Sequence, residues 1–206
     1  VGTLFRLCGV LLLLLLLVAV IVFLLGRRRP ARKAGVERAA VEWTGAGPPP
    51  LGQWTSSYKL GMDNFDESFS IETEEGAFLG ECGMGITEAL GQEAPRRVAA
   101  LEVWLFDKSD IRTVTKVLMS DYVYNSEGLR SKLLPKGEPV LAAPGAAFTL
   151  ETSSLTVEAR VVEMGYGDGM PAFGYFSNLT VSLVAHLKPG ADVSGGMPVP
   201  PGMGVS

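Results

Sequence analysis

His186 is the only histidine in the chain, and Cys8 and Cys82 are the only cysteines. Every Ser/His/Asp or Cys/His mechanism would therefore have to use His186 as its base. This residue occupies a polar position near Lys188 and Pro189, which indicates a solvated site at a sheet edge. Zinc sites usually take three or four nitrogen and sulfur ligands, and these counts leave no such set. We expect no catalytic residue, no bound metal and no cofactor.

Acidic side chains gather in a short stretch near the start of the predicted domain. Carboxylate oxygens in such a stretch could bind a hard cation such as Ca²⁺. Their spacing, however, lacks the EF-hand pattern, which needs Asp or Asn at positions one, three and five and Gly at six. A solvated acidic rim that meets a basic partner, or holds the domain off an anionic membrane, is the simpler interpretation. Acid–base catalysis remains open as an alternative, and it would need two carboxylates to converge in a cleft. The stretch contains Asp63, Asp66, Glu67, Glu72, Glu74 and Glu75.

Glycine is frequent just after this acidic stretch, at Gly80, Gly83, Gly85 and Gly91. A dinucleotide-binding loop would show G-x-G-x-x-G between a strand and a helix, and a Walker loop would show Gly-Lys-Ser/Thr. Neither pattern is present. The glycines therefore indicate a bulge or close packing rather than a phosphate site.

After the strand-breaking residues 107–110, a helix is predicted that Ser109 or Asp110 would cap and whose apolar positions run from Ile111 to Tyr122. Its β-branched residues argue against this assignment. On such a helix, basic residues at four-residue steps would line one side, usually as a solvated face. As a second interpretation, Arg112 and Lys116 dock on an acidic surface of a partner. The helical pattern uses Ile111, Val114, Leu118 and Tyr122, and the basic side uses Lys108, Arg112 and Lys116. A second, shorter helix is predicted from Ser126 to just before Pro135.

Alternation of apolar and polar residues predicts strands over most of the remaining chain. A hairpin is expected at 68–79, a buried central strand at 98–106, and half-buried strands at 148–150, 155–161 and 179–187. Strands with one wet face are typical of antiparallel sheets. We therefore predict an α+β fold, mainly an antiparallel β-sandwich or partial barrel with a one- or two-helix insertion.

Before this domain, Leu7–Leu25 forms an apolar run without charge or proline, close to the roughly 20 residues that a helix needs to cross a bilayer. One basic residue, Arg6, precedes the run, and several follow it. This charge distribution opposes a secretory signal peptide and places the C-terminal side in the cytoplasm. The predicted membrane flank consists of Arg27, Arg28, Arg29, Arg32 and Lys33.

These features divide the chain into four parts. Residues 1–29 are a transmembrane anchor with a basic flank, and 30–57 a Pro/Gly-rich tether. Residues 58–189 are a soluble domain, and 190–206 a flexible Gly/Pro tail. Within the tether, Trp43 and Trp54 are expected as packing anchors or, alternatively, as partner contacts.

Charge differs sharply between the two halves of the chain. Residues 1–42 carry seven basic and two acidic residues, a net charge of +5, whereas 43–206 carry 11 basic and 20 acidic residues, a net charge of −9. A basic segment beside the membrane favours contact with membrane lipid. An acidic domain is repelled by nucleic acid, so we expect no nucleic-acid partner.

Together these observations predict a non-enzymatic, single-pass membrane protein. Its cytoplasmic domain would act as an accessory or scaffold subunit among other membrane-protein subunits. A bioenergetic assembly, photosynthetic or respiratory, is one class of host. The alternative is a free-standing, membrane-tethered module that binds a soluble protein or small ligand, and it predicts a defined concave pocket.

Overall fold

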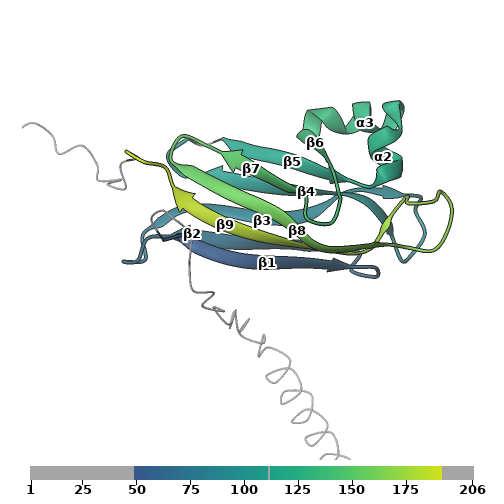
Figure 1. The fold of residues 1–206 in the computed structure, drawn as a ribbon, viewed down its shortest axis with the longest axis horizontal. Coiled ribbons are helices and arrows are strands. Elements are labelled where there is room, and N and C mark those ends of the chain that lie inside the picture. The colour runs from purple at the N-terminus through teal and green to yellow at the C-terminus, as the bar shows by residue number, and fades with distance from the viewer. Residues whose placement is uncertain (1–48, 111, 192–206) are drawn as a thin grey trace, which may run out of the picture. The chain divides into compact units, whose positions relative to one another are not determined.

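The computed structural model describes residues 49–110 and 112–191, which form two β-sheets packed face to face (Figure 1). One sheet has the order β1-β9-β8-β7, with β1 (Gly52–Lys59), β9 (Phe176–Leu187), β8 (Leu155–Tyr166) and β7 (Ala147–Glu151). The other has the order β2-β3-β4-β5-β6, with β2 (Asp66–Glu72), β3 (Phe78–Leu90), β4 (Arg97–Asp107), β5 (Thr113–Met119) and β6 (Glu138–Leu141). Neighbouring strands are antiparallel except for the β5–β6 pair.

The parallel β5–β6 pair requires a crossover connection, and short helices supply it. These are α2 (Asp121–Asn125), α3 (Glu127–Leu133) and the 3₁₀ helix η1 (Leu134–Lys136). Ser120 caps α2, because its hydroxyl accepts a hydrogen bond from the backbone N–H of Val123 at 3.3 Å. Val123 and Leu133 then bury a small apolar cluster against the five-stranded sheet. The second predicted helix is confirmed by α3, which begins one residue after Ser126.

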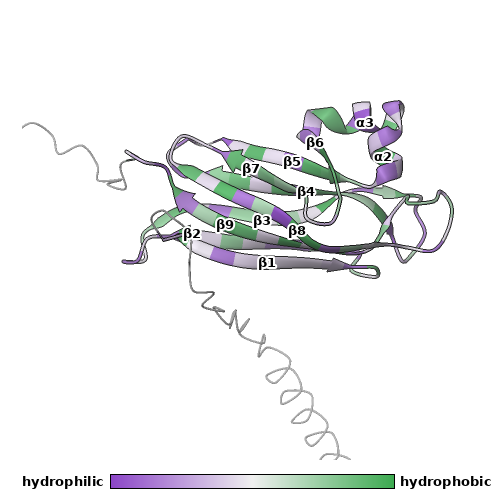
Figure 2. Cartoon of the chain, viewed as in Figure 1, coloured by the Kyte–Doolittle hydropathy of each residue, from purple (hydrophilic) through white to green (hydrophobic). Residues whose placement is uncertain are grey.

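The main core lies between the two sheets and follows from the alternation along each strand. In β4, Leu101, Val103 and Leu105 are fully buried, while the residues between them are half-buried. Figure 2 shows the same alternation of apolar and polar positions along the long strands. The prediction of a mainly antiparallel, β-rich domain with short helices is thus confirmed.

The helix predicted from about Ile111 to Tyr122 is wrong over most of its length, because Thr113–Met119 forms strand β5. β5 pairs with β4 along its whole length, and Thr113, Thr115 and Val117 face away from the main core. Stiff β-branched side chains favour a pleated strand over a helix. Lys108, Arg112 and Lys116 therefore do not line one side of a helix.

The sheet also begins earlier than the predicted domain boundary at residue 58. Strand β1 starts at Gly52, so 52–57 belong to the sandwich rather than to a tether. Trp54 stacks on Phe69 of β2 with ring centroids 5.7 Å apart, and the Ser56 hydroxyl donates to the Glu67 carboxylate at 2.7 Å. These contacts join the edge strands of the two sheets.

The predicted membrane span, its basic flank, most of the tether and the tail lie outside the described residues. Across 49–110 and 112–191, no helix is both long and apolar enough to span a bilayer.

The sandwich has two ends with different connections (Figure 1). At the end that we call the joining end, the Leu51 N–H donates to the Ala185 carbonyl and the Lys188 N–H donates to the Ser154 carbonyl, each at 2.8 Å. At the opposite end, which we call the loop end, the β1–β2, β3–β4 and β8–β9 loops meet. There the Arg97 guanidinium donates to the Met170 carbonyl at 3.2 Å. Both described ends of the chain thus lie away from the loop end.

Candidate functional site

Of the residues predicted to contact a partner or the membrane, three lie in the described part of the chain. Trp54 is a half-buried residue of β1, held by its stacking on Phe69. Arg112 is exposed beside β5 and makes a two-point contact with the Asp110 carboxylate, at 2.9 and 3.1 Å. Trp43 and the basic flank fall outside the described residues, so their roles stay predictions.

Lys116 differs from the other predicted contacts because it points toward the core side of β5. Its register partner in β4 is the buried Val103, and its ammonium lies 3.0 Å from the Glu138 carboxylate of β6. The side chain is only 17% exposed. The ion pair with β6 thus accounts for Lys116 inside this domain.

His186 and three of the four glycines that the sequence singles out as candidates for chemistry lie within strands of the two sheets. His186 is half-buried opposite Thr156, and β9 lies inside its sheet rather than at an edge. A Cβ at Gly83 would meet the Glu67 carbonyl and the Trp104 ring, which identifies close packing as the reason for this glycine. Among the described residues, no group of three or more His, Cys, Asp or Glu side chains could hold a metal ion.

The most extensive polar contacts of the described domain centre on Asp107, which is fully buried at the joining end. Its carboxylate accepts bonds from the N–H and hydroxyl of both Ser109 and Ser154 and from the Thr152 hydroxyl, at 2.6–3.0 Å. Burial alone would raise the pKa of Asp107, but these hydrogen bonds outweigh it and hold the pKa well below its usual range. A carboxylate saturated in this way joins the end of β4 to the β7–β8 turn, and it has no free lone pair for catalysis.

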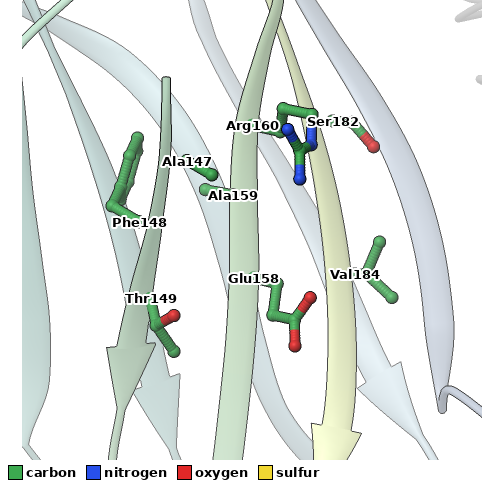
Figure 3. Close-up of a pocket in the computed structure, with 8 residues that line it drawn as sticks. All are labelled: Ala147, Phe148, Thr149, Glu158, Ala159, Arg160, Ser182 and Val184. Atoms are coloured by element: carbon green, nitrogen blue, oxygen red, sulfur yellow. The ribbon is translucent and has the colours of Figure 1, made fainter. Parts of the chain in front are cut away.

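A shallow depression of about 210 Å³ lies on the outer face of β7, β8 and β9 (Figure 3). Glu158 and Arg160 project from β8 beside Ser182 and Val184 of β9. Small-molecule sites usually measure about 300–1,000 Å³ and bury most of their ligand. The depression is smaller than that range and offers no nucleophile–base pair.

The loop end presents large apolar side chains to solvent. Met170 and Phe173 of the β8–β9 loop are 79% and 59% exposed, and Tyr122 of α2 is 39% exposed. Tyr122 and Phe173 are neighbours, since the Tyr122 N–H donates to the Phe173 carbonyl at 3.3 Å. Grouped exposure of this kind marks interaction surfaces more often than scattered single residues do.

Several contacts brace the β8–β9 loop. The Tyr175 hydroxyl donates to the Asp168 carbonyl at 2.8 Å, and the Gly174 N–H donates to the Pro171 carbonyl at 3.1 Å. The Phe173 ring meets the Tyr166 ring edge to face, with centroids 5.4 Å apart. The loop thus offers its apolar side chains from a fixed backbone, which lowers the entropy cost of docking.

Phe173 itself adopts a left-handed backbone conformation, with φ of 54°. An L-residue with a bulky side chain pays about 1–2 kcal/mol for this region. Strain of this kind persists only where the surroundings enforce it, and it concentrates at functional sites. The conformation turns Phe173 against Tyr166 while more than half of its surface stays in solvent.

Comparison of the chain with protein-family models, with curated proteins and with solved structures gives no match. The candidate site therefore rests on the geometry of the loop end. Its signal in the sequence was the composition of 165–175, where Met, Phe and two Tyr stand among four glycines. A loop that only needed solvation would carry polar residues instead.

Proposed function

We propose that this chain is a non-enzymatic, single-pass membrane protein whose domain binds a larger membrane complex as an accessory subunit. The observation that carries the proposal is the exposed apolar cluster of Met170, Phe173 and Tyr122 on a braced loop. Apolar anchors held in place and bordered by polar side chains are typical of the centre of protein interfaces.

The place where the predicted tether joins the domain supports the same proposal. The predicted anchor and tether join the domain at Leu51, at the joining end, while the apolar cluster lies at the loop end. Docking through the loop end leaves the tether free to reach the bilayer. We further propose that the domain lies on the cytoplasmic side, because the predicted span is followed by Arg27, Arg28 and Arg29.

The test is to extract the tagged, full-length protein from its own membranes in mild detergent and to identify stoichiometric companions by mass spectrometry. We expect co-purification with one multi-subunit membrane complex. The double change Met170→Ser/Phe173→Ser should release that complex. The matched control is Phe78→Ser, which removes an exposed ring at the joining end, where β3 begins, and should leave the companions in place.

Two results would count against the proposal. Recovery of the unaltered protein alone would oppose a stable assembly and favour the tethered module. Equal release by the loop-end and control variants would show that the loss follows general destabilisation rather than the loop-end surface.

A further inference from the structure

The two sheets of the described sandwich have four edge strands, and three of them are protected against pairing with a further strand. β1 and β2 lie against each other, with Trp54 stacked on Phe69. β6 contains Pro139, which has no N–H to donate, and it contacts helix α2. β7 (Ala147–Glu151) has neither proline nor lysine, and its register with β8 shows no bulge. It therefore lacks the usual features that discourage strand addition.

The backbone of β7 presents hydrogen-bonding groups on its open side. Next to the strand, the Val161 N–H donates to the Ala146 carbonyl at 2.9 Å, and the Thr152 N–H donates to the Leu155 carbonyl at 3.0 Å. Because antiparallel ladders bond at every second residue, the even-numbered residues of β7 face β8. The N–H and C=O groups that face away from β8 belong to Ala147, Thr149 and Glu151. No other strand of the described domain pairs with them.

The space beside β7 also leaves part of the other sheet uncovered. β7 packs over β4 and β5, so β6 extends beyond it. Glu138 of β6 is the register partner of Lys116 and shares its core-facing side, yet the Glu138 side chain is 67% exposed. Val140 lies on the same side and is half-buried. A strand added to β7 would cover this side of β6.

The outer side of β7 is complementary in charge to a second copy of itself. Antiparallel pairing of the whole strand about a two-fold axis at Thr149 places Ala147 opposite Glu151 of the second copy. Arg160 of β8 is the register partner of Ala147, so it lies in the same row. The row spans two strand spacings, about 9–10 Å. Arginine and glutamate side chains meet over that distance, because the alanine between them is small.

Both charged groups of this row have capacity for a second partner. The Arg160 guanidinium donates to the Gly145 carbonyl at a long 3.4 Å, and a guanidinium has five N–H donors. Glu151 is 60% exposed in its ion pair with Lys188. The depression of about 210 Å³ lies beside Ala147 and Arg160 (Figure 3). It provides room for the Glu151 side chain of the second copy.

The core-facing side of β7 offers an apolar match in the same register. Phe148 is half-buried and comes opposite Leu150 of the second copy. This pair is not hydrogen-bonded, and such pairs bring their side chains closest together. Aromatic side chains opposite apolar ones stabilise paired strands.

We propose that two copies of this chain pair through β7, so that their four-stranded sheets join into one continuous sheet of eight strands. The interface uses the same surface of both copies and therefore closes at a dimer. Five paired residues make a small interface, so the dimer dissociates on dilution. β7 is separate from the loop end, and the inference does not depend on the proposed function.

Sedimentation equilibrium of the full-length protein in a density-matched, mild detergent tests the proposal. We expect a monomer–dimer equilibrium that depends on protein concentration. Thr149→Pro should abolish the dimer, because the lost N–H faces the second copy rather than β8. The circular dichroism spectrum and the unfolding midpoint of this variant should match those of the unaltered protein, which excludes a fold defect.

Charge reversal tests the register. Arg160→Glu places like charges in both symmetry-related rows and should raise the dimer dissociation constant at least about tenfold. The double change Arg160→Glu/Glu151→Arg restores opposite charges and should bring the constant back to within about threefold of the original. Glu158→Gln alters an exposed carboxylate in the neighbouring row and is the matched control, with no change expected.

Oxidative cross-linking tests the position of the contact. With Cys8 replaced by serine, Thr149→Cys places one thiol of each copy at the two-fold axis. Cα atoms of a hydrogen-bonded pair are about 5.5 Å apart, which a disulfide can bridge. We expect a linked dimer from this variant and none from Ser131→Cys, which is exposed on α3. Cys82 is buried and gives no background.

Four results would overturn the proposal. A chain that stays monomeric at every concentration would show that β7 does not pair with a second copy. A dimer that survives Thr149→Pro would place the contact on another surface. Failure of the double charge reversal to restore pairing would exclude this register. Equal cross-linking of Thr149→Cys and Ser131→Cys would show random encounter.

Discussion

Asp107 shows how one residue can hold two sheets together at the joining end. We predict that Asp107→Asn lowers the free energy of unfolding by about 3 kcal/mol, because an amide nitrogen cannot accept the N–H and hydroxyl donors that now reach a buried carboxylate. Urea unfolding of the full-length protein in detergent, followed by tryptophan fluorescence, measures this change. Glu158→Gln, on an exposed face, should stay within about 0.5 kcal/mol of the unaltered protein.

The same carboxylate predicts a pH dependence. The pKa of Asp107 is lowered in the folded state, so its contribution is complete above the pKa of an unfolded aspartate, about 3.9, and is lost as the pH falls below it. Unfolding midpoints measured from pH 6 to pH 2 should fall steeply in the acid range. The Asp107→Asn variant should lose part of that slope, and an unchanged slope would contradict the assignment.

At Gly83 we predict that adding a side-chain atom, rather than removing a contact, destabilises the protein. An alanine Cβ there would collide with the Glu67 carbonyl and lie 2.7 Å from Trp104 Cζ2. Because one of these neighbours is backbone, relief requires the strand to move. We expect Gly83→Ala to cost about 2 kcal/mol and to shift the tryptophan emission. Gly128→Ala, where a Cβ meets nothing, is the control and should be neutral or slightly stabilising.

At the scale of elements, the sequence predicts the strands whose alternation is regular and misses those whose alternation is broken by one residue. Strand β1 has a polar residue, Ser56, at a fully buried position, so its pattern resembles a tether. In β5, Val114 and Leu118 are four residues apart, a spacing that both a helix and one face of a strand allow. Lys116 lies between them on the core-facing side, where a strand would be expected to carry an apolar residue, so the alternation of apolar and polar residues is not visible in the sequence.

A single substitution can distinguish a strand from a helix at 113–119, because the free energy of unfolding should change in opposite directions in the two cases. Thr115 is opposite Trp104 in the β4–β5 ladder. In a strand, Thr115→Ala should destabilise the protein by about 1 kcal/mol, because alanine packs poorly on a pleated surface. In a helix the same change would stabilise by about 0.5 kcal/mol. Urea unfolding decides the sign.

The loop end could not be predicted in the same way, since it depends on contacts between distant segments. Tyr122 and Phe173 lie 51 positions apart and meet only because α2 and the β8–β9 loop occupy the same end of the sandwich. The sequence does show aromatic and methionine residues among glycines in 165–175. It does not show that the backbone of Phe173 is left-handed or that Tyr166 fixes its ring. Such long-range contacts require the strand order.

At the scale of the whole molecule, the predicted membrane span implies that the domain lies on the cytoplasmic side. Labelling of cysteines can test this prediction, because the chain has only two of its own. Cys82 is fully buried, and burial and then Glu81 raise the pKa of its thiol to about 12. A neutral, buried thiol reacts slowly with maleimides. Replacement of Cys8 by serine therefore leaves a chain without a reactive background.

On this background, Ser131→Cys places a thiol at an exposed position of α3. If the domain is cytoplasmic, an impermeant maleimide should label this cysteine only after sealed, right-side-out membranes are opened. Thr3→Cys, before the predicted span, should be labelled without opening and serves as the control. Labelling of Ser131→Cys in sealed membranes would instead place the domain outside. The positive-inside argument would then fail for this chain, and partners would have to be sought on that side.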